Sequence, residues 1–334
     1  MNELNSNTSL LLSTSEDYSL PRLAKFYLFV VLEPPAIICN TLLVFYLLFD
    51  RNLRLTLHYH GLLALLITSL LNNLVEVPRI IHYLHSGVVT IQSMINCIIW
   101  QCCDYLMFSM INVLMLWTSI ERHLLIFNSQ LYSTSKHRLY LHYGPLVVVI
   151  IYMCLFYIGA VLIYPCEPQL DFTQPLCGYP CYTGYSNISV YDLLAHGWIP
   201  LCCSVLFDIG FVLRTIYRRR VGIREPAVQW RKHRKMMFQL LVISSLCSAC
   251  QIPFVSLLFV QLFTQLPDMV LYIQTTYFYY LFWFLTMILP FACLGCLPEV
   301  INRMKKMLLR KFTRKNRITM LHTSRFPNKT ASRM

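Results

Sequence analysis

The chain is poor in charge and in glycine. Of its 334 residues, 13% are charged and 57% are hydrophobic, and only 10 are glycine. Soluble globular domains carry about 25% charged residues. This shortage excludes an ordinary soluble domain, because a soluble chain of this length would expose far more charge to water.

The motifs of common enzyme classes are missing as well. The sequence has no His-Glu-x-x-His zinc spacing, no Gly-x-Ser-x-Gly nucleophile motif and no phosphate-binding loop. We therefore expect no enzyme, no cofactor and no metal site. No inverted repeat and no pair of broken half-helices is visible, which disfavours a transporter.

What the sequence has instead is long apolar segments, each long enough to cross a bilayer. About 20 apolar residues span the hydrocarbon core, and in lipid the backbone must satisfy its own hydrogen bonds, which requires helices. The period-two alternation of a transmembrane barrel is not seen. The segments predict an all-α membrane protein, a seven-transmembrane helix bundle, and they run over residues 26–49, 58–84, 94–120, 142–164, 193–217, 236–263 and 270–297.

Basic residues predict the orientation of the bundle. Of the 28 lysines and arginines, 25 fall in connections on one side of the predicted spans, and only Arg22, Lys25 and Arg79 fall on the other. Positive charge stays in the cytoplasm, so we expect an extracellular N-terminus. The net charge of +13 then reflects topology and contact with anionic lipid. It does not indicate a nucleic acid partner.

The segments at the two ends of the chain differ from the bundle. Residues 1–25 form a polar tail, predicted to be extracellular, which lacks the basic start and apolar core of a cleaved signal peptide. Residues 298–334 begin with an amphipathic helix and continue as a cytoplasmic tail. We divide the chain into this first tail, a transmembrane domain of residues 26–297, and the C-terminal segment. An apolar stripe marks the interfacial helix: Val300, Ile301, Met304, Leu308 and Phe312.

Two modifications are expected on the outer side. Asn7 and Asn187 begin Asn-x-Ser/Thr sequons and are predicted glycosylation sites. Most of the 14 cysteines lie within spans, where cysteine acts as a small apolar residue. The others lie where a disulfide can form. The first expectation is Cys97–Cys181 with Cys166–Cys177, and the alternative is Cys97–Cys177.

A charged triplet, Glu121-Arg122-His123, follows the third apolar segment. The 25 residues from Cys97 to Arg122 rise about 37 Å as a helix, which is enough to reach the opposite membrane face. A basic residue that ends a span is ordinary anchoring. The acid beside it has no orienting use, and the two can form a pair that a conformational change breaks.

These features together resemble the rhodopsin-like (class A) G-protein-coupled receptors. The resemblance implies a plasma-membrane receptor that binds an extracellular ligand and acts on a heterotrimeric G protein. It covers the length of the bundle, and the final amphipathic helix matches the family's eighth helix. The residues that match the family's pattern are Asn40, Leu63-Ala64, Cys97, Glu121-Arg122-His123, Pro200, Pro253 and Pro290.

Several positions depart from the family's pattern. Where the family has an aspartate three residues after Leu-Ala, this chain has Ile67, and where it has a tryptophan two residues before the sixth-span proline, this chain has Gln251. In the family's Asn-Pro-x-x-Tyr motif, Leu289 replaces the asparagine and Cys293 replaces the tyrosine. The positions that would hold a sodium ion are apolar, Ile111 among them, so we expect no sodium site. The resemblance therefore implies a divergent receptor of this family.

An aspartate in the third span is the first candidate for ligand binding. Asp104 lies 18 residues before Arg122, which is five whole helical turns, so both face the bundle interior about 27 Å apart. A carboxylate in lipid is costly without a partner. In the family this position binds the ammonium of amine ligands. The alternative is that Asp104 is a structural partner of His196 or of a tyrosine.

Other candidates surround Asp104 by register. Glu76 and Glu33 add two acids, and Asp192 and His196 occupy the fifth-span face where amine receptors usually carry serines. A catecholamine-like ligand is therefore disfavoured, and a basic peptide or another cationic small molecule fits. A carboxylate among aromatic rings suits a cation, although aromatics in spans mostly serve packing. The aromatic candidates are Tyr105, Phe108, Phe254, Tyr279, Tyr280 and Trp283.

The inner end should carry activation and coupling. Asp208, in the inner half of the fifth span, is predicted to pair with Arg122 in one of two conformations, or else to meet water or Arg214. The sixth and seventh spans carry Pro253 and Pro290. The basic connection before the sixth span predicts a G-protein docking surface, unless its charge only sets topology. The rival functions are a non-signalling decoy or scaffold, which nucleotide exchange would distinguish, and a transporter, which solute flux would distinguish.

Overall fold

The computed structural model describes residues 2–51, 58–127, 134–220, 227–296 and 301, and every regular element in these ranges is a helix. Seven of the helical segments are long and apolar enough to cross a membrane. The fold predicted from the sequence is confirmed: the chain is a seven-helix bundle and a multi-pass membrane protein.

The spans agree with the predicted segments to within a few residues at most ends. The structure places them at Pro21–Phe49, Tyr59–Ser86, Met94–Leu125, Lys136–Ile163, Asn187–Arg218, Leu241–Gln261 and Asp268–Cys296. The fourth and fifth spans both begin six residues before the predicted starts, because helix continues into the flanking polar sequence over residues 136–141 and 187–192. A span's hydropathy alone does not reveal such extensions.

Several spans are built from more than one helical element. The first three are α1 (Asn2–Phe49), α3 (His58–Ser86) and α4 (Met94–Phe127). The fourth span consists of α5 (Ser135–Arg138), η2 (Leu139–Tyr143), α6 (Gly144–Tyr157) and η3 (Ile158–Ile163), and the fifth of α7 (Ser186–Asp192), η6 (Leu193–Trp198) and α8 (Ile199–Arg220). The sixth span lies in α9 (Ala227–Gln261). The seventh consists of α10 (Asp268–Thr276), η7 (Phe278–Tyr280) and α11 (Leu281–Cys296).

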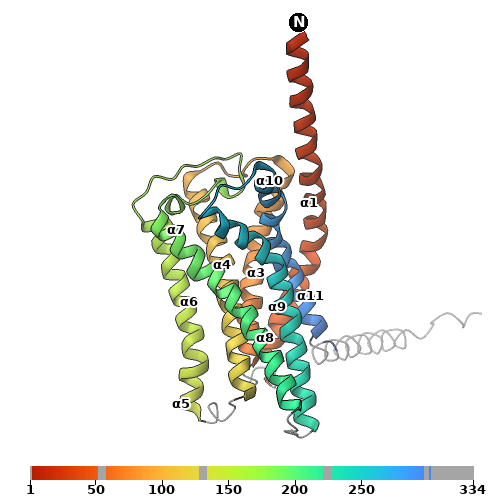
Figure 1. Ribbon diagram of the computed structural model, residues 1–334, viewed down its shortest axis with the longest axis vertical. Helices are drawn as coiled ribbons and strands as arrows, with labels where there is room; N and C mark the ends of the chain where they lie inside the picture. Colours follow the sequence, from red (N-terminus) through yellow and green to blue (C-terminus); the bar gives the residue numbers. More distant parts are fainter. Residues whose placement is uncertain (1, 52–57, 128–133, 221–226, 297–300, 302–334) are drawn as a thin grey trace, which may run out of the picture.

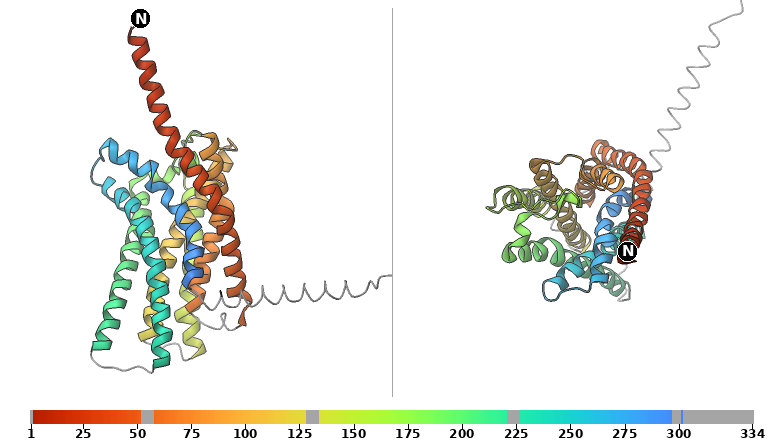
Figure 2. Two further views of the ribbon diagram at one scale, coloured as in Figure 1. Left: turned by 90° about the vertical axis from the view of Figure 1, so that its right-hand side faces the viewer. Right: turned by 90° about the horizontal axis from the view of Figure 1, so that it is seen from above.

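The helices stand side by side with α4 inside the bundle (Figure 1). We call the end that carries α7 and α10 the upper end, and the end that carries α5 the lower end. Figure 2 shows that α1 rises well beyond the upper end, so the segment predicted as a polar tail is helical from Asn2. The spans of α3 and α4 are the most buried, whereas α6 lies at the periphery. Polar side chains on α4 are therefore shielded from lipid.

A connection of residues 164–185, which we call the cavity loop, lies across the upper end. Disulfides Cys97–Cys177 and Cys166–Cys181 fix it, each with Cα atoms 5.8 Å apart. The first expectation, Cys97–Cys181 with Cys166–Cys177, is wrong, and the alternative Cys97–Cys177 is confirmed. Leu176, just before that cysteine, has a positive φ of 59°, an uncommon backbone conformation that marks a sharp turn. Sequence spacing cannot show which cysteine such a turn delivers to α4.

Some predictions fall partly or wholly outside the described residues. The amphipathic helix of residues 298–312 does so except for Ile301, which is helical, and so does the C-terminal tail. Asn187 is exposed at the start of the fifth span, where a glycan has room. Asn7 lies in α1, and its side chain is not described. Glycosylation at both sites stays a prediction.

Candidate functional site

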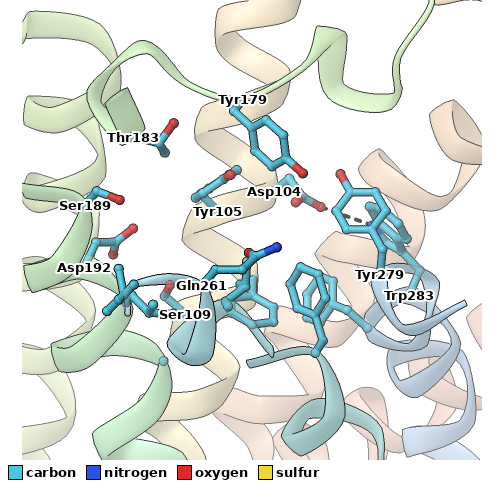
Figure 3. A pocket seen from close by; sticks show the side chains of 17 residues that line it. Asp104, Tyr105, Ser109, Tyr179, Thr183, Ser189, Asp192, Gln261, Tyr279 and Trp283 are labelled. Carbon is cyan, nitrogen blue, oxygen red and sulfur yellow. Dashed lines mark hydrogen bonds between the residues drawn. The ribbon is translucent and has the colours of Figure 1, made fainter. Parts of the chain in front are cut away.

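The upper half of the bundle encloses a cavity of about 250 Å³. Residues of α4, the cavity loop, α7, η6, α9, η7 and α11 line it (Figure 3). The cavity therefore lies where the third, fifth, sixth and seventh spans converge beneath a loop. Six of the residues predicted to bind ligand line it: Asp104, Tyr105, Phe108, Phe254, Tyr279 and Trp283.

Asp104 projects from α4 into this cavity and is 6% exposed. The indole Nε1 of Trp283 donates a hydrogen bond to its Oδ1 at 3.1 Å, and within the described ranges no other donor to this carboxylate is found. A carboxylate has about four acceptor sites, so most of its capacity remains unused. The alternative that Asp104 pairs with His196 or a tyrosine is wrong, since its partner is a tryptophan of the seventh span.

Aromatic rings surround the side of the cavity where Asp104 lies. The rings of Tyr279 and Trp283 meet edge to face, with centroids 5.0 Å apart. The ring of Phe254 lies 5.7 Å from that of Tyr279, and the rings of Phe108 and Phe282 are 5.1 Å apart. Ring faces attract cations, and more strongly when water is excluded. The carboxylate and the rings together suit a positively charged group.

A second acid, Asp192, lies on the other side of the cavity beside Ser189 (Figure 3). Its Oδ1 accepts hydrogen bonds from the hydroxyl of Tyr157 at 2.5 Å and from Nδ1 of His196 at 2.7 Å, and its Oδ2 accepts one from Tyr182 at 2.7 Å. Burial and the charge of Asp192 raise the pKa of Tyr182 well above its ordinary value. Asp192 therefore joins the fourth span, the fifth span and the cavity loop.

Two predicted ligand residues do not line the cavity. His196 is 2% exposed and lies behind Asp192, with its Nε2 2.9 Å from the hydroxyl of Tyr152. Glu76 is completely buried on α3, close enough to Asp104 to interact electrostatically. That either side chain contacts ligand stays a prediction, which absence from the cavity wall does not support. Each interacts with a residue of the cavity wall instead. His196 contacts Asp192, and Glu76 interacts electrostatically with Asp104.

A polar seam runs from the cavity into the middle of the bundle. The hydroxyl of Thr286 donates to the carbonyl oxygen of Trp283 at 2.8 Å, and its own carbonyl accepts from Ser69 at 2.8 Å. Asn40 donates to Ser69 at 3.2 Å. Ile67, predicted to replace an interior aspartate, is 37% exposed, so Ser69 takes the interior position beside Asn40. That the chain has no sodium site stays a prediction.

The lower end carries the predicted coupling residues. Glu121 and Arg122 are 1% and 3% exposed, and Glu121 forms an ion pair with His142 of η2. Asp208 accepts a hydrogen bond from Ser244 of α9. Arg214, the alternative partner of Asp208, has its Nη1 3.1 Å from Nε2 of His123. Pairing of Asp208 with Arg122 stays a prediction about another conformation.

The helix-breaking residues are where the sequence placed them. Pro253 lies inside α9 and Pro290 inside α11, where each removes a backbone hydrogen bond and permits a bend. Gln251, at the position of the family's tryptophan, is 2% exposed. On the upper side of these prolines, Phe254 of α9 and Trp283 of α11 line the cavity.

Sequence reasoning missed several cavity residues. Ser109 lies one helical turn after Tyr105, and Gln261 lies two turns after Phe254, so helical spacing could have found both. Tyr179 and Thr183 come from the cavity loop. No sequence signal could have placed them, because their position depends on which cysteine bonds to Cys97.

Comparisons with known proteins give no further information on this site. A scan against models of protein families and a search of curated proteins found no match for this chain. The function of the cavity and of the lower end must therefore be inferred from the residues themselves, from their burial, their partners and their charge.

Proposed function

We propose that the protein is a divergent rhodopsin-like G-protein-coupled receptor of the plasma membrane. It binds an extracellular cationic ligand, an amine or a basic peptide, and promotes nucleotide exchange on a heterotrimeric G protein. The observation that carries this proposal is Asp104, a carboxylate 6% exposed in an aromatic cavity with one donor, Trp283.

The physical argument begins with the cost of a buried carboxylate. Asp104 sits at membrane depth on α4, where an ionised acid is costly unless it is paired. A ligand ammonium or guanidinium supplies the missing charge through charge-assisted hydrogen bonds, and Tyr279 and Trp283 add cation–π attraction. Because Asp192 already accepts three hydrogen bonds, the cavity wall offers one anchoring acid. The ligand should therefore insert one positive group.

The lower end supports the second half of the proposal. Basic residues gather there, and Lys136, Arg138, Arg214 and Arg218 are all on described helices. We infer from this charge that the lower end faces the cytoplasm, where it suits an acidic protein partner. Arg122, almost fully buried at that end, becomes accessible only if the helices around it separate.

The polar seam offers a route between the two ends. A ligand that engages Asp104 binds beside its bond to Trp283, whose carbonyl holds Thr286. Thr286 in turn holds α3 through Ser69. Ligand binding then shifts the population towards a conformation with an open lower end, by as much as the ligand prefers that conformation.

The test is a binding and nucleotide-exchange experiment in membranes that carry the protein and a panel of G proteins. Amines and basic peptides are screened, and responses are compared between the natural chain and Asp104→Asn at matched surface expression. Asparagine keeps the oxygen that accepts from Trp283 but loses the charge. We expect affinity for a cationic ligand to fall by about 100-fold or more, the effect of removing one partner of a buried charge pair.

A matched control is Asp268→Asn, an acid exposed at the start of α10 on the same end, which should leave affinity unchanged. Equal affinity in Asp104→Asn would exclude Asp104 as the anchor. Saturable binding without nucleotide exchange on any G protein would favour a decoy or scaffold. Ligand-dependent solute flux would favour a transporter.

A further inference from the structure

A second, larger hollow lies within the cavity loop itself, and we call it the loop hollow. Its volume is about 1280 Å³, and every residue that lines it belongs to the loop, between Pro165 and Tyr185. Tyr179 and Thr183 line both this hollow and the cavity that contains Asp104. Figure 3 draws both side chains higher in the view than Asp104. The two spaces are therefore neighbours that share a wall.

The cavity around Asp104 is small for a complete ligand. Its volume of about 250 Å³ lies below the range of about 300–1,000 Å³ that is usual for pockets enclosing a drug-sized molecule. One basic side chain or one chain terminus fits such a space, and the rest of a larger ligand lies outside it. The loop hollow supplies adjoining space for that remainder.

An unpaired length of backbone borders the loop hollow. Residues 165–170 form no helix, strand or turn, and all of them except Pro168 line the hollow. Pro165 and Pro168 bias the residue before each of them towards extended backbone. Within the described residues, the N–H groups of this segment after Cys166 donate no hydrogen bond, and its carbonyl groups accept none. Extended backbone with free donors and acceptors is a template for another chain.

The loop hollow carries negative charge. The cavity loop has no lysine, arginine or histidine, and its two acids, Glu167 and Asp171, both line the hollow. Asp171 accepts hydrogen bonds from Thr173 and Gln174 of the same loop. Glu167 is exposed, and within the described part of the chain it pairs with no other side chain. Two acids without a base suit a positively charged partner.

We propose that the ligand is an extracellular basic peptide and that the loop hollow is the second part of its binding site. One basic group of the peptide enters the cavity and meets Asp104. The adjoining peptide backbone lies along residues 165–170 as an added strand, and Glu167 attracts a further basic side chain. This inference rests on the proposed function, because it selects a peptide over an amine as the ligand of the same receptor.

A peptide matches this surface better than a small amine for a physical reason. Each peptide unit offers one N–H donor and one C=O acceptor, which complement the unpaired groups of residues 165–170. A small amine confined to the cavity offers nothing to that backbone. The disulfides Cys97–Cys177 and Cys166–Cys181 already fix the loop, so binding a peptide there requires little further ordering of the receptor.

The first measurement is equilibrium binding to the purified full chain in lipid nanodiscs, with a library of basic pentapeptides and a library of small monovalent amines. Glu167→Gln removes the exposed charge and should weaken the peptides about twofold to fivefold, the effect of an exposed ion pair. It should leave the amines unchanged. Asp104→Asn should weaken both classes. The matched control, Asp268→Asn, removes an exposed acid outside the loop hollow and should change neither.

These outcomes separate the peptide from the receptor. Equal peptide affinity in the natural chain and Glu167→Gln would overturn the loop hollow as part of the site. Amines that bind as tightly as the peptides, with both classes weakened by Asp104→Asn, would overturn the peptide inference and leave the proposed function standing. No saturable binding from either library would overturn both.

The second measurement is amide hydrogen exchange in the cavity loop, with and without the tightest pentapeptide. The amides of Glu167, Gln169 and Leu170 should exchange severalfold more slowly in the complex, because the added strand pairs with them. The matched control is the amide of Asp171, which already donates to the carbonyl of Cys177 at 3.0 Å and should keep its protection. Saturating amine should protect none of them. Unchanged exchange at all three amides in the peptide complex would overturn the added strand.

Discussion

The two ends of α4 carry buried acids in opposite surroundings. At the upper end, Asp104 has one donor, Trp283, and opens onto a cavity of about 250 Å³. At the lower end, Glu121 is held by His142 on one side and lies near Gly61 on the other. One acid has unused acceptor capacity and space beside it, whereas the other has a histidine partner and no space.

This difference shows how one helix can serve two tasks. The cavity loop and η6 line the space beside Asp104, and Asp192 ties the fifth span to the fourth and to that loop. Contact at Glu121 exists because Gly61 lets α3 approach. An unsatisfied acid with room around it can accept a ligand, and a satisfied acid without room can hold one conformation until its partner is removed.

The largest expected effect comes from breaking the covalent support of the upper end. The disulfide Cys97–Cys177 closes a loop of 80 residues, and Cys166–Cys181 closes one of 15. Chain entropy gives stabilisation of about 4.5 and about 3 kcal/mol respectively. The double variant Cys97→Ser with Cys177→Ser should therefore lower the free energy of unfolding more than Cys166→Ser with Cys181→Ser, measured by denaturant unfolding in detergent.

The same two double variants should also differ in ligand binding at the cavity. Cys97 joins α4 to the loop that carries Tyr179, so the first variant should also weaken binding at Asp104. Peptide mapping that finds Cys97 bonded to Cys181 would contradict the assignment. An equal loss of stability in both double variants would contradict the entropic argument.

A smaller effect should come from adding one methyl group at the lower end. Gly61→Ala places a Cβ 2.5 Å from Cγ2 of Thr118, and overpacking of this kind costs about 1–3 kcal/mol. Gly210→Ala on α8 is the matched control, because a Cβ there meets nothing within 4 Å. Alanine favours helix over glycine by up to about 1 kcal/mol, so the control should be neutral or stabilising. Thermal unfolding of both variants measures the difference, and equal Tm values would show that the lower end is not tightly packed.

The fold could be predicted from sequence because it depends on additive properties. Seven apolar runs and the requirement that backbone groups be satisfied in lipid determine seven helices. Asp104 and Trp283 were also predictable as cavity residues, since helical period places them on interior faces. The same helical period places Glu121 and Arg122 on the buried face of α4.

The rest could not be predicted because it depends on contacts between distant segments. The partner of Asp104 is 179 positions away, and the partner of Glu121 comes from a π-helical turn that shifts the register of the fourth span. The disulfide pairing depends on the turn at Leu176. Alignment to the family's pattern put Ile67 at an interior position of α3, whereas its side chain is 37% exposed. The alignment relied on the pair Leu63-Ala64, which lies in a run of similar apolar residues and therefore fixes the register poorly.

The smallest expected effect is local and lies in the cavity loop. Asp171 accepts hydrogen bonds from the backbone N–H and hydroxyl of Thr173 at 2.9 and 2.6 Å, and from Gln174 at 2.9 Å. The side-chain and backbone donors of Thr173 lower the pKa of Asp171. A lowered folded pKa means that the stabilisation is complete above the ordinary pKa near 4 and is lost as pH falls towards the folded value.

Hydrogen exchange at the Thr173 amide measures this effect. Its protection should fall severalfold as pH is lowered from 6 to 3, beyond the intrinsic change in rate, whereas the Val89 amide, which donates to the carbonyl of Phe172 at 3.0 Å, should keep its protection. Asp171→Asn retains an acceptor but does not titrate, so its Thr173 amide should lose the pH dependence. The same dependence in both chains would mean that the carboxylate does not order the loop, which the two disulfides and the hydrogen bond of Tyr182 to Asp192 would still hold over Asp104.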